Sequence, residues 1–190
     1  MTAATRLVPP LALCLLILAA PAARAELSLM PDRSNSMMVA ALNNDLDRVK
    51  TFLATGSNPN MLDTEGRTVL IHAATSGNAP LAKLVLDAGA KPTILDRSGN
   101  SALHYAADRG NVEVLRLMLD AKAPPDTPNK QGITPLMTAS GRGRTEIVRL
   151  LLARGASVDK QDYTGRDALN WAEDHRQNGV AAILRQAGAK

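Results

Sequence analysis

Aromatic residues are almost absent from this chain, since only 2% of its 190 residues are Phe, Tyr or Trp. Proteins that bind single-stranded nucleic acid stack its bases on aromatic side chains, so this shortage argues against that class of function. The sequence has 45% hydrophobic and 21% charged residues. This balance predicts a folded protein whose core consists of Leu, Val, Ile and Ala in thin layers.

Cysteine is also nearly missing, because Cys14 is the only one. It lies in an apolar run at residues 7–20, which follows Arg6 and precedes an A-x-A pattern at residues 23–25. This order is typical of a secretory signal peptide, so we expect residues 1–25 to be removed. An uncleaved membrane anchor is the alternative, although the run is shorter than the ~20 residues that a transmembrane helix needs.

Removal of residues 1–25 would change the charge of the protein. The whole chain has 22 basic and 18 acidic residues, and losing Arg6 and Arg24 leaves 20 against 18, a formal +2 instead of +4. A nearly neutral protein is not predicted to bind nucleic acid, and one without cysteine has no disulfide and no Cys-based zinc site. We expect a periplasmic monomer with no stable membrane anchor; secretion into the medium is the alternative.

A period of 33 residues runs through the rest of the chain. It is marked by glycines at equivalent positions, namely Gly66, Gly99, Gly132 and Gly165. Each glycine ends an Asp/Asn-x-x-Gly stretch, in which the acid or amide bonds its own backbone and the glycine accepts a positive φ. A residue that can cap a helix follows each turn: Thr68, Ser101, Thr134 or Asp167.

Two helices follow each turn. In residues 99–119 (GNSALHYAADRGNVEVLRLML) a glycine separates the first helix from a second one whose apolar residues are spaced three and four apart. Gly89 and Gly155 stand where such second helices end, which predicts left-handed C-caps. Lys122 takes this position in residues 96–128, so it must adopt a positive φ or reshape the turn at a cost of about 1 kcal/mol.

A turn and two helices at a period of 33 residues resemble the ankyrin repeat. Thr134-Pro135-Leu136-Met137 and Ser101-Ala102-Leu103-His104 partly match its T-P-L-H opening. The resemblance implies an all-α solenoid of about five stacked helix-turn-helix units with short β-turn loops. We divide the chain into a signal peptide (1–25), an N-terminal arm (26–35), a capping unit one (36–62), repeat units two (63–95), three (96–128) and four (129–161), and a C-terminal capping unit five (162–190).

The chain carries no motif that predicts catalysis. His72, His104 and His175 lack partner spacings such as H-E-x-x-H, and the resemblance implies that His104 bridges neighbouring loops. Most methionines fall at core positions or in the N-terminal arm, which favours packing over metal binding. We therefore predict a non-enzymatic protein without a cofactor. The alternative is a metal- or haem-handling protein that supports a periplasmic redox enzyme, with His72, Tyr105 and the methionines as ligands.

In proteins that resemble this one, the turn tips and the exposed end of each first helix line a concave groove that binds other proteins. The candidate groove residues at these positions are Arg67, Arg97, Arg109, Lys130, Arg142, Tyr163, Arg166 and His175. We predict that an acidic surface of a partner protein docks there, with Arg109 and Arg142 as paired anchors. Two alternatives stay open: a solvated surface partly neutralised by Asp108 and Asp174, and a secreted effector that acts on a host protein.

Overall fold

A computed structural model of the chain describes residues 36–189. The predicted signal peptide (1–25) and N-terminal arm (26–35) lie outside the described residues. The described residues form ten α-helices: α2 (Met37–Leu42), α3 (Leu46–Ala54), α4 (Val69–Ser76), α5 (Ala79–Asp87), α6 (Ala102–Arg109), α7 (Val112–Asp120), α8 (Pro135–Gly141), α9 (Thr145–Ala153), α10 (Ala168–Asp174) and α11 (Asn178–Gln186).

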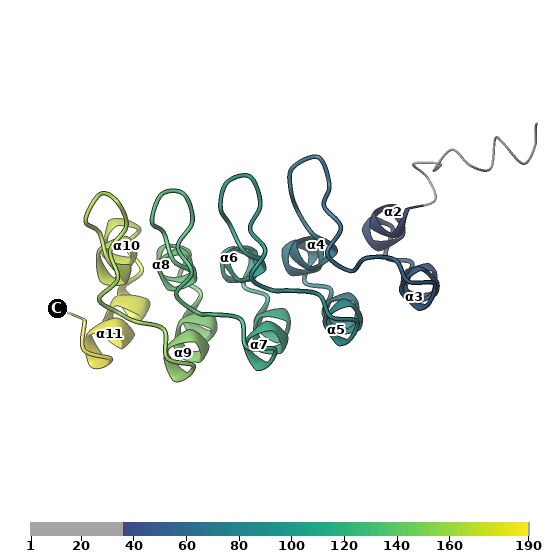
Figure 1. Cartoon of the computed structure of the whole chain (residues 1–190). Helices are drawn as coiled ribbons and strands as arrows, with labels where there is room; N and C mark the ends of the chain where they lie inside the picture. Colours follow the sequence, from purple (N-terminus) through teal and green to yellow (C-terminus); the bar gives the residue numbers. More distant parts are fainter. Residues whose placement is uncertain (1–35, 190) are drawn as a thin grey trace, which may run out of the picture. The chain divides into compact units, whose positions relative to one another are not determined.

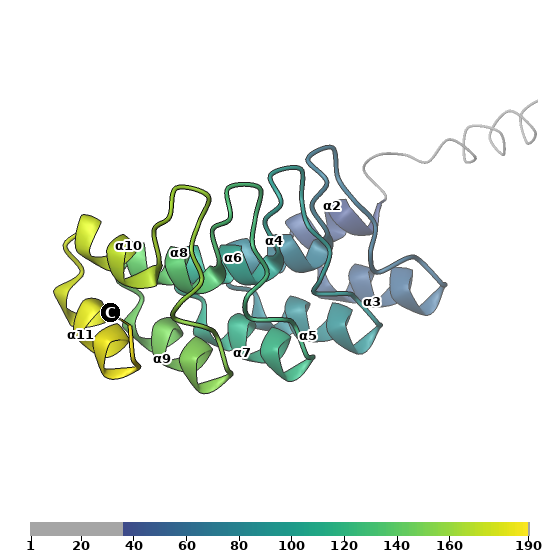
Figure 2. The same ribbon diagram turned by 60° about the vertical axis from the view of Figure 1, so that its left-hand side comes forward.

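The helices stack in two rows (Figure 1). The first row holds α2, α4, α6, α8 and α10, and the second holds α3, α5, α7, α9 and α11. The long turns between units all project beyond the first row, as a second view also shows (Figure 2). The predicted all-α solenoid of five units is confirmed. Within residues 36–189, none of the helices is both long and apolar enough to span a membrane.

One side-chain oxygen organises each long turn. In unit three, Oδ1 of Asp96 accepts hydrogen bonds from the backbone N–H groups of Ser98 (2.8 Å) and Asn100 (2.9 Å). Equivalent bonds are made by Asp63, Asn129 and Asp162. This is the turn chemistry that the Asp/Asn-x-x-Gly pattern predicts, and Gly99 has the expected positive φ of 80°.

Backbone hydrogen bonds also join the tips of successive turns. The three bonds run from the N–H of Arg97 to the carbonyl of Glu65 (3.1 Å), from Lys130 to Ser98 (3.2 Å) and from Tyr163 to Gln131 (3.0 Å). Each donor lies at a candidate groove position. These positions therefore belong to a ladder that fixes the spacing of the turns.

The first helices begin at the predicted caps. Side-chain oxygens of Thr68, Thr134 and Asp167 accept from backbone N–H groups three residues on, at 3.2, 3.3 and 2.8 Å. In unit three, the Ser101 N–H donates to Nδ1 of His104 (3.0 Å), so Nε2 carries the proton and donates to the Ile133 carbonyl (3.0 Å). His104 therefore bridges units three and four. Burial lowers its pKa, although the bond to Ile133 acts in the opposite direction.

The core is aliphatic, as the shortage of aromatic residues predicts. The described methionines pack in or against it, since Met37, Met38, Met118 and Met137 are buried and Met61 is half-buried against the core. The second helices end at glycines with positive φ, including Gly89 (87°) and Gly155 (85°). Lys122 adopts the same left-handed conformation (φ 63°), which confirms the first of the two predicted possibilities.

Candidate functional site

We use "groove face" for the side of the first-row helices that carries the candidate groove residues. One side-chain pair recurs along it, in which a large polar ring of the first helix bonds to the aspartate that organises its own turn. The three pairs are His72 Nε2 with Asp63 Oδ2 (2.8 Å), Tyr105 Oη with Asp96 Oδ2 (2.5 Å) and Trp171 Nε1 with Asp162 Oδ2 (3.0 Å). Each pair clamps a turn onto its helix.

Unit four departs from this pattern. Asn129 and Thr138 occupy the two positions, and within the described residues they make no bond to each other. Asn129 instead donates to Asn100 Oδ1 (2.9 Å), and the Thr138 hydroxyl donates to the Thr134 carbonyl (3.1 Å). Gly141 follows three residues after Thr138, on the same side of the helix. Thr138 and Gly141 are therefore small residues at two positions where the neighbouring units have larger ones. Unit three has Tyr105 and Asp108 there, and unit five has Trp171 and Asp174.

A cavity of ≈ 260 Å³ occupies this place, and we call it the unit-four notch. It is lined by Asp108, Asn129, Ile133, Thr138, Gly141, Arg142, Trp171 and His175. The rings of Trp171 and His175 are parallel, with centroids 5.5 Å apart. A Cβ atom at Gly141 would lie 3.1 Å from Trp171 Cε3 and 3.3 Å from His175 Nδ1. Only glycine keeps the floor of the notch free of this crowding.

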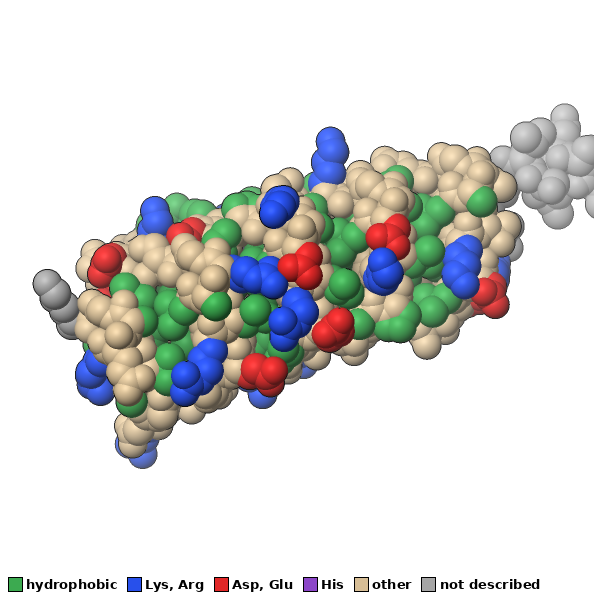
Figure 3. Space-filling view, turned by 90° about the horizontal axis from the view of Figure 1, so that it is seen from below, with side chains coloured by type: hydrophobic (Ala, Val, Ile, Leu, Met, Phe, Trp, Pro, Cys, Tyr) green, Lys and Arg blue, Asp and Glu red, His purple; other side chains and the backbone are tan. Residues whose placement is uncertain are grey.

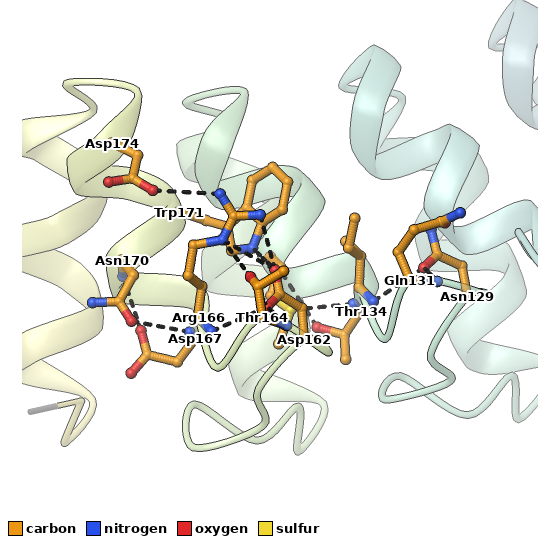
Figure 4. Close-up of polar contacts among 12 residues, drawn as sticks. Asn129, Gln131, Thr134, Asp162, Thr164, Arg166, Asp167, Asn170, Trp171 and Asp174 are labelled. Atoms are coloured by element: carbon orange, nitrogen blue, oxygen red, sulfur yellow. Dashed lines mark hydrogen bonds and ion pairs between the residues drawn. The ribbon is translucent and has the colours of Figure 1, made fainter.

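The Trp171 wall of the notch is held from two sides (Figure 4). Its indole N–H donates to Asp162, whose side chain is only 2% exposed, and the Arg166 guanidinium lies 4.6 Å from the ring centroid. Arg166 also pairs with Asp162 (3.2 Å) and Asp174 (3.7 Å). The burial of Asp162 opposes ionisation, but hydrogen bonds from Thr164, Arg166 and Trp171 outweigh it and lower its pKa well below the ordinary value. Trp171 is therefore held by a charged carboxylate on one side and by a guanidinium group on another.

Of the two predicted anchors, Arg142 lines the notch, and Arg109 shares the Asp108 carboxylate with it. Oδ1 of Asp108 is 2.6 Å from Nε of Arg142, and Oδ2 is 3.6 Å from Nε of Arg109. The arginine side chains are 63% and 59% exposed, whereas that of Asp108 is 28% exposed. Within residues 36–189, the only hydrogen bond that either guanidinium group makes is the one from Arg142 Nε to Asp108. Their terminal nitrogens are therefore able to bind another anion.

The other candidate groove residues are arranged differently. Arg97, Lys130 and Tyr163 lie at successive turn tips, and Tyr163 is 76% exposed. Arg67 is half-buried, with its guanidinium carbon 6.0 Å from the centroid of the Tyr105 ring, and its Nε is buried with no hydrogen-bond partner in the described part of the chain. Arg67 is therefore a contact between units two and three, whereas Arg142 and His175 line the notch.

Two models of protein families match this chain. One, described as "Ankyrin repeats (3 copies)", matches residues 37–127, and another, "Ankyrin repeats (many copies)", matches residues 103–152. The chain belongs to the ankyrin-repeat family. No curated protein matches its sequence. Ankyrin repeats generally mediate protein–protein interaction and are typically non-enzymatic modules.

The metal-handling alternative concerns residues that the ankyrin array uses structurally. His72 and Tyr105 are each bonded to the aspartate of their own turn. Ligation of an ion by either side chain would require one of these clamps to open. Among residues 36–189, no three His, Cys, Asp or Glu side chains are grouped in a way that could hold a metal ion.

The sequence reasoning missed the notch, although a signal for it exists. Positions 72, 105, 138 and 171 hold His, Tyr, Thr and Trp, and positions 75, 108, 141 and 174 hold Thr, Asp, Gly and Asp. In both series unit four has a smaller residue than its two neighbours. Comparison of side-chain size along these positions would have located the hollow.

Proposed function

We propose that this ankyrin array is a non-enzymatic protein-binding module of the cell envelope, and that its partner docks on the groove face of units three and four. The observation that carries the proposal is the pair Arg109 and Arg142, which one carboxylate orients beside a preformed notch. Guanidinium groups bind carboxylates through two parallel hydrogen bonds. An acidic partner surface fits this arrangement.

The opposite side of the array supports the same choice. Figure 3 views the array from the side of the second-row helices and shows basic and acidic side chains interspersed. The second-row helices carry local ion pairs, including Lys83 with Asp87 (3.0 Å) in α5 and Arg154 at the end of α9 with Asp120 of α7 (2.8 Å). Exposed pairs of this kind contribute little and are typical of a solvated surface.

A pull-down from envelope extract tests the choice of face. The groove variant combines Arg109→Glu with Arg142→Glu. Its matched control combines Arg116→Glu with Arg149→Glu, which lie in α7 and α9 of the same two units and give the same change of charge. We expect the wild type and the control to capture the same protein and the groove variant to lose it. Equal capture by all three would contradict docking on the groove face.

The location of the protein is a separate proposal that rests on the signal-peptide pattern of residues 1–25. Cell fractionation followed by sequencing of the N-terminus should find the protein in the periplasm, starting at Glu26. Recovery from the culture medium would favour the secreted effector. A membrane-bound form that still begins at Met1 would support the uncleaved anchor and contradict the proposed location.

A further inference from the structure

The unit-four notch has the size of a site for one side chain. Its volume of ≈ 260 Å³ is below the range of about 300–1,000 Å³ that is usual for pockets enclosing whole small molecules. We propose that it binds one aromatic side chain of an extended partner segment, while an acidic residue next to that side chain pairs with Arg142 and Arg109. This inference rests on the proposed function and specifies the chemistry of the partner.

The walls favour an aromatic occupant. The Trp171 and His175 rings stack on each other and both line the notch, and Ile133 adds an apolar side chain. Aromatic rings gain from offset or edge-to-face contact with one another, beyond what the burial of apolar area gives. Arg166, Asp162 and the indole hydrogen bond keep Trp171 in place, so the site exists before the partner binds. A preformed site loses less entropy on binding.

The rim favours a carboxylate beside that ring. Asp108 accepts a hydrogen bond from Nε of Arg142 and lies 3.6 Å from Nε of Arg109, and within residues 36–189 no terminal nitrogen of either arginine makes a hydrogen bond. Both arginines are more exposed than this aspartate. An approaching segment therefore meets guanidinium groups first. His175 donates a hydrogen bond from Nδ1 to the Trp171 carbonyl (2.9 Å), and its ring adds no negative charge to the site.

Unit three shows which residues would fill the notch in unit four. Asn129→Asp together with Thr138→Tyr gives unit four the residue pair that unit three has in Asp96 and Tyr105, with the ring bonded to the turn. Thr138→Ser is the matched control, because it leaves the hollow open. Gly141→Ala is a second, independent filling change, since its Cβ would crowd Trp171. Circular dichroism and thermal unfolding establish that each variant is folded.

The test is a selection from a random peptide library displayed on phage, using the full chain. We expect the wild type and Thr138→Ser to enrich peptides that have an aromatic residue next to Asp or Glu. One enriched peptide is then titrated against each protein. Trp171 is the only tryptophan of the chain and lines the notch, so its fluorescence should change on binding. Both filled variants should bind at least about tenfold more weakly, as for loss of a central anchor.

Several results would overturn the inference. These are the absence of any enriched peptide, enrichment of peptides without an aromatic residue, unchanged affinity in both filled variants, or free N-acetylphenylalanine binding as tightly as the peptide. The groove variant separates this failure from failure of the proposed function. Peptides that bind the filled notch but not the Arg109→Glu/Arg142→Glu protein would leave the groove face standing, whereas peptides that bind both would refute the two proposals together.

Discussion

Replacing Asp162 by Asn tests how the Trp171 wall is built. Oδ1 of Asp162 accepts from the N–H groups of Thr164 and Arg166, and an amide oxygen serves this purpose equally well, as Asn129 shows in unit four. Oδ2 accepts from Trp171 Nε1 (3.0 Å) and pairs with the Arg166 guanidinium (3.2 Å). An NH₂ group at that place would face two donors.

The size of the effect follows from these contacts. Hydrogen bonds to a charged group contribute about 1.5–3 kcal/mol each, and a buried donor left unpaired costs about 1–3 kcal/mol. We therefore expect Asp162→Asn to lower the free energy of unfolding by about 2–4 kcal/mol. For a protein of this size, this corresponds to a decrease in Tm of roughly 5–15 °C.

Asp167→Asn is the matched control, because Asp167 caps α10 through an oxygen that Asn also provides. Thermal unfolding followed by circular dichroism gives the two Tm values, and Trp171 fluorescence reports the wall directly. The pH dependence gives a second measurement. Because the pKa of Asp162 is lowered in the folded state, its stabilisation is present above the unfolded pKa of about 3.9 and is lost as the pH falls below it. If Asp162→Asn unfolded at the same temperature as Asp167→Asn, this reasoning would be wrong.

Three further predictions concern the array. Lys122→Gly should raise the free energy of unfolding by about 0.5–1 kcal/mol, because glycine adopts the positive φ without strain, whereas Lys122→Ala should not; urea unfolding would measure both. The buried His104 has a lowered pKa, so the free energy of unfolding should fall as the pH drops below about 6.5, by at most about 1.4 kcal/mol per pH unit. A His104→Gln variant whose free energy of unfolding depended on pH in the same way would refute this. Leu115→Ala should cost about 2–5 kcal/mol because Leu115 is fully buried, and Leu95→Ala, at a 40% exposed position, should cost much less by the same urea assay.

The architecture could be predicted from the sequence because every unit repeats the same local chemistry. The turn at Asp96 and the cap at Thr134 each depend on contacts within about four residues, and the period of 33 residues places them in register. Lys122 illustrates how far this reaches, since its register predicted either a positive φ or a reshaped turn, and the backbone has the positive φ. Signals of this kind do not require knowledge of how side chains meet across units.

The site was only partly predictable, because it depends on contacts between units. Register placed Arg109 and Arg142 in the same series, but not the single carboxylate of Asp108 that both share. Register also predicted that Arg67 is a groove residue like the others, whereas Arg67 packs on Tyr105 and is half-buried. The notch results from differences in side-chain size between equivalent positions of neighbouring units. The repeat period identifies these positions but gives no information on how their side chains differ.

The most direct measurement is the affinity of one captured partner for three forms of the chain, by isothermal titration calorimetry. These are the wild type, the groove variant (Arg109→Glu/Arg142→Glu) and the matched control (Arg116→Glu/Arg149→Glu). We expect the groove variant to bind at least about tenfold more weakly than the wild type, and the control to bind like the wild type. A tenfold weaker affinity corresponds to a loss of only about 1.4 kcal/mol of binding free energy. If the control lost affinity and the groove variant kept it, the partner would dock on the second-row helices, and the groove face would not be the binding site.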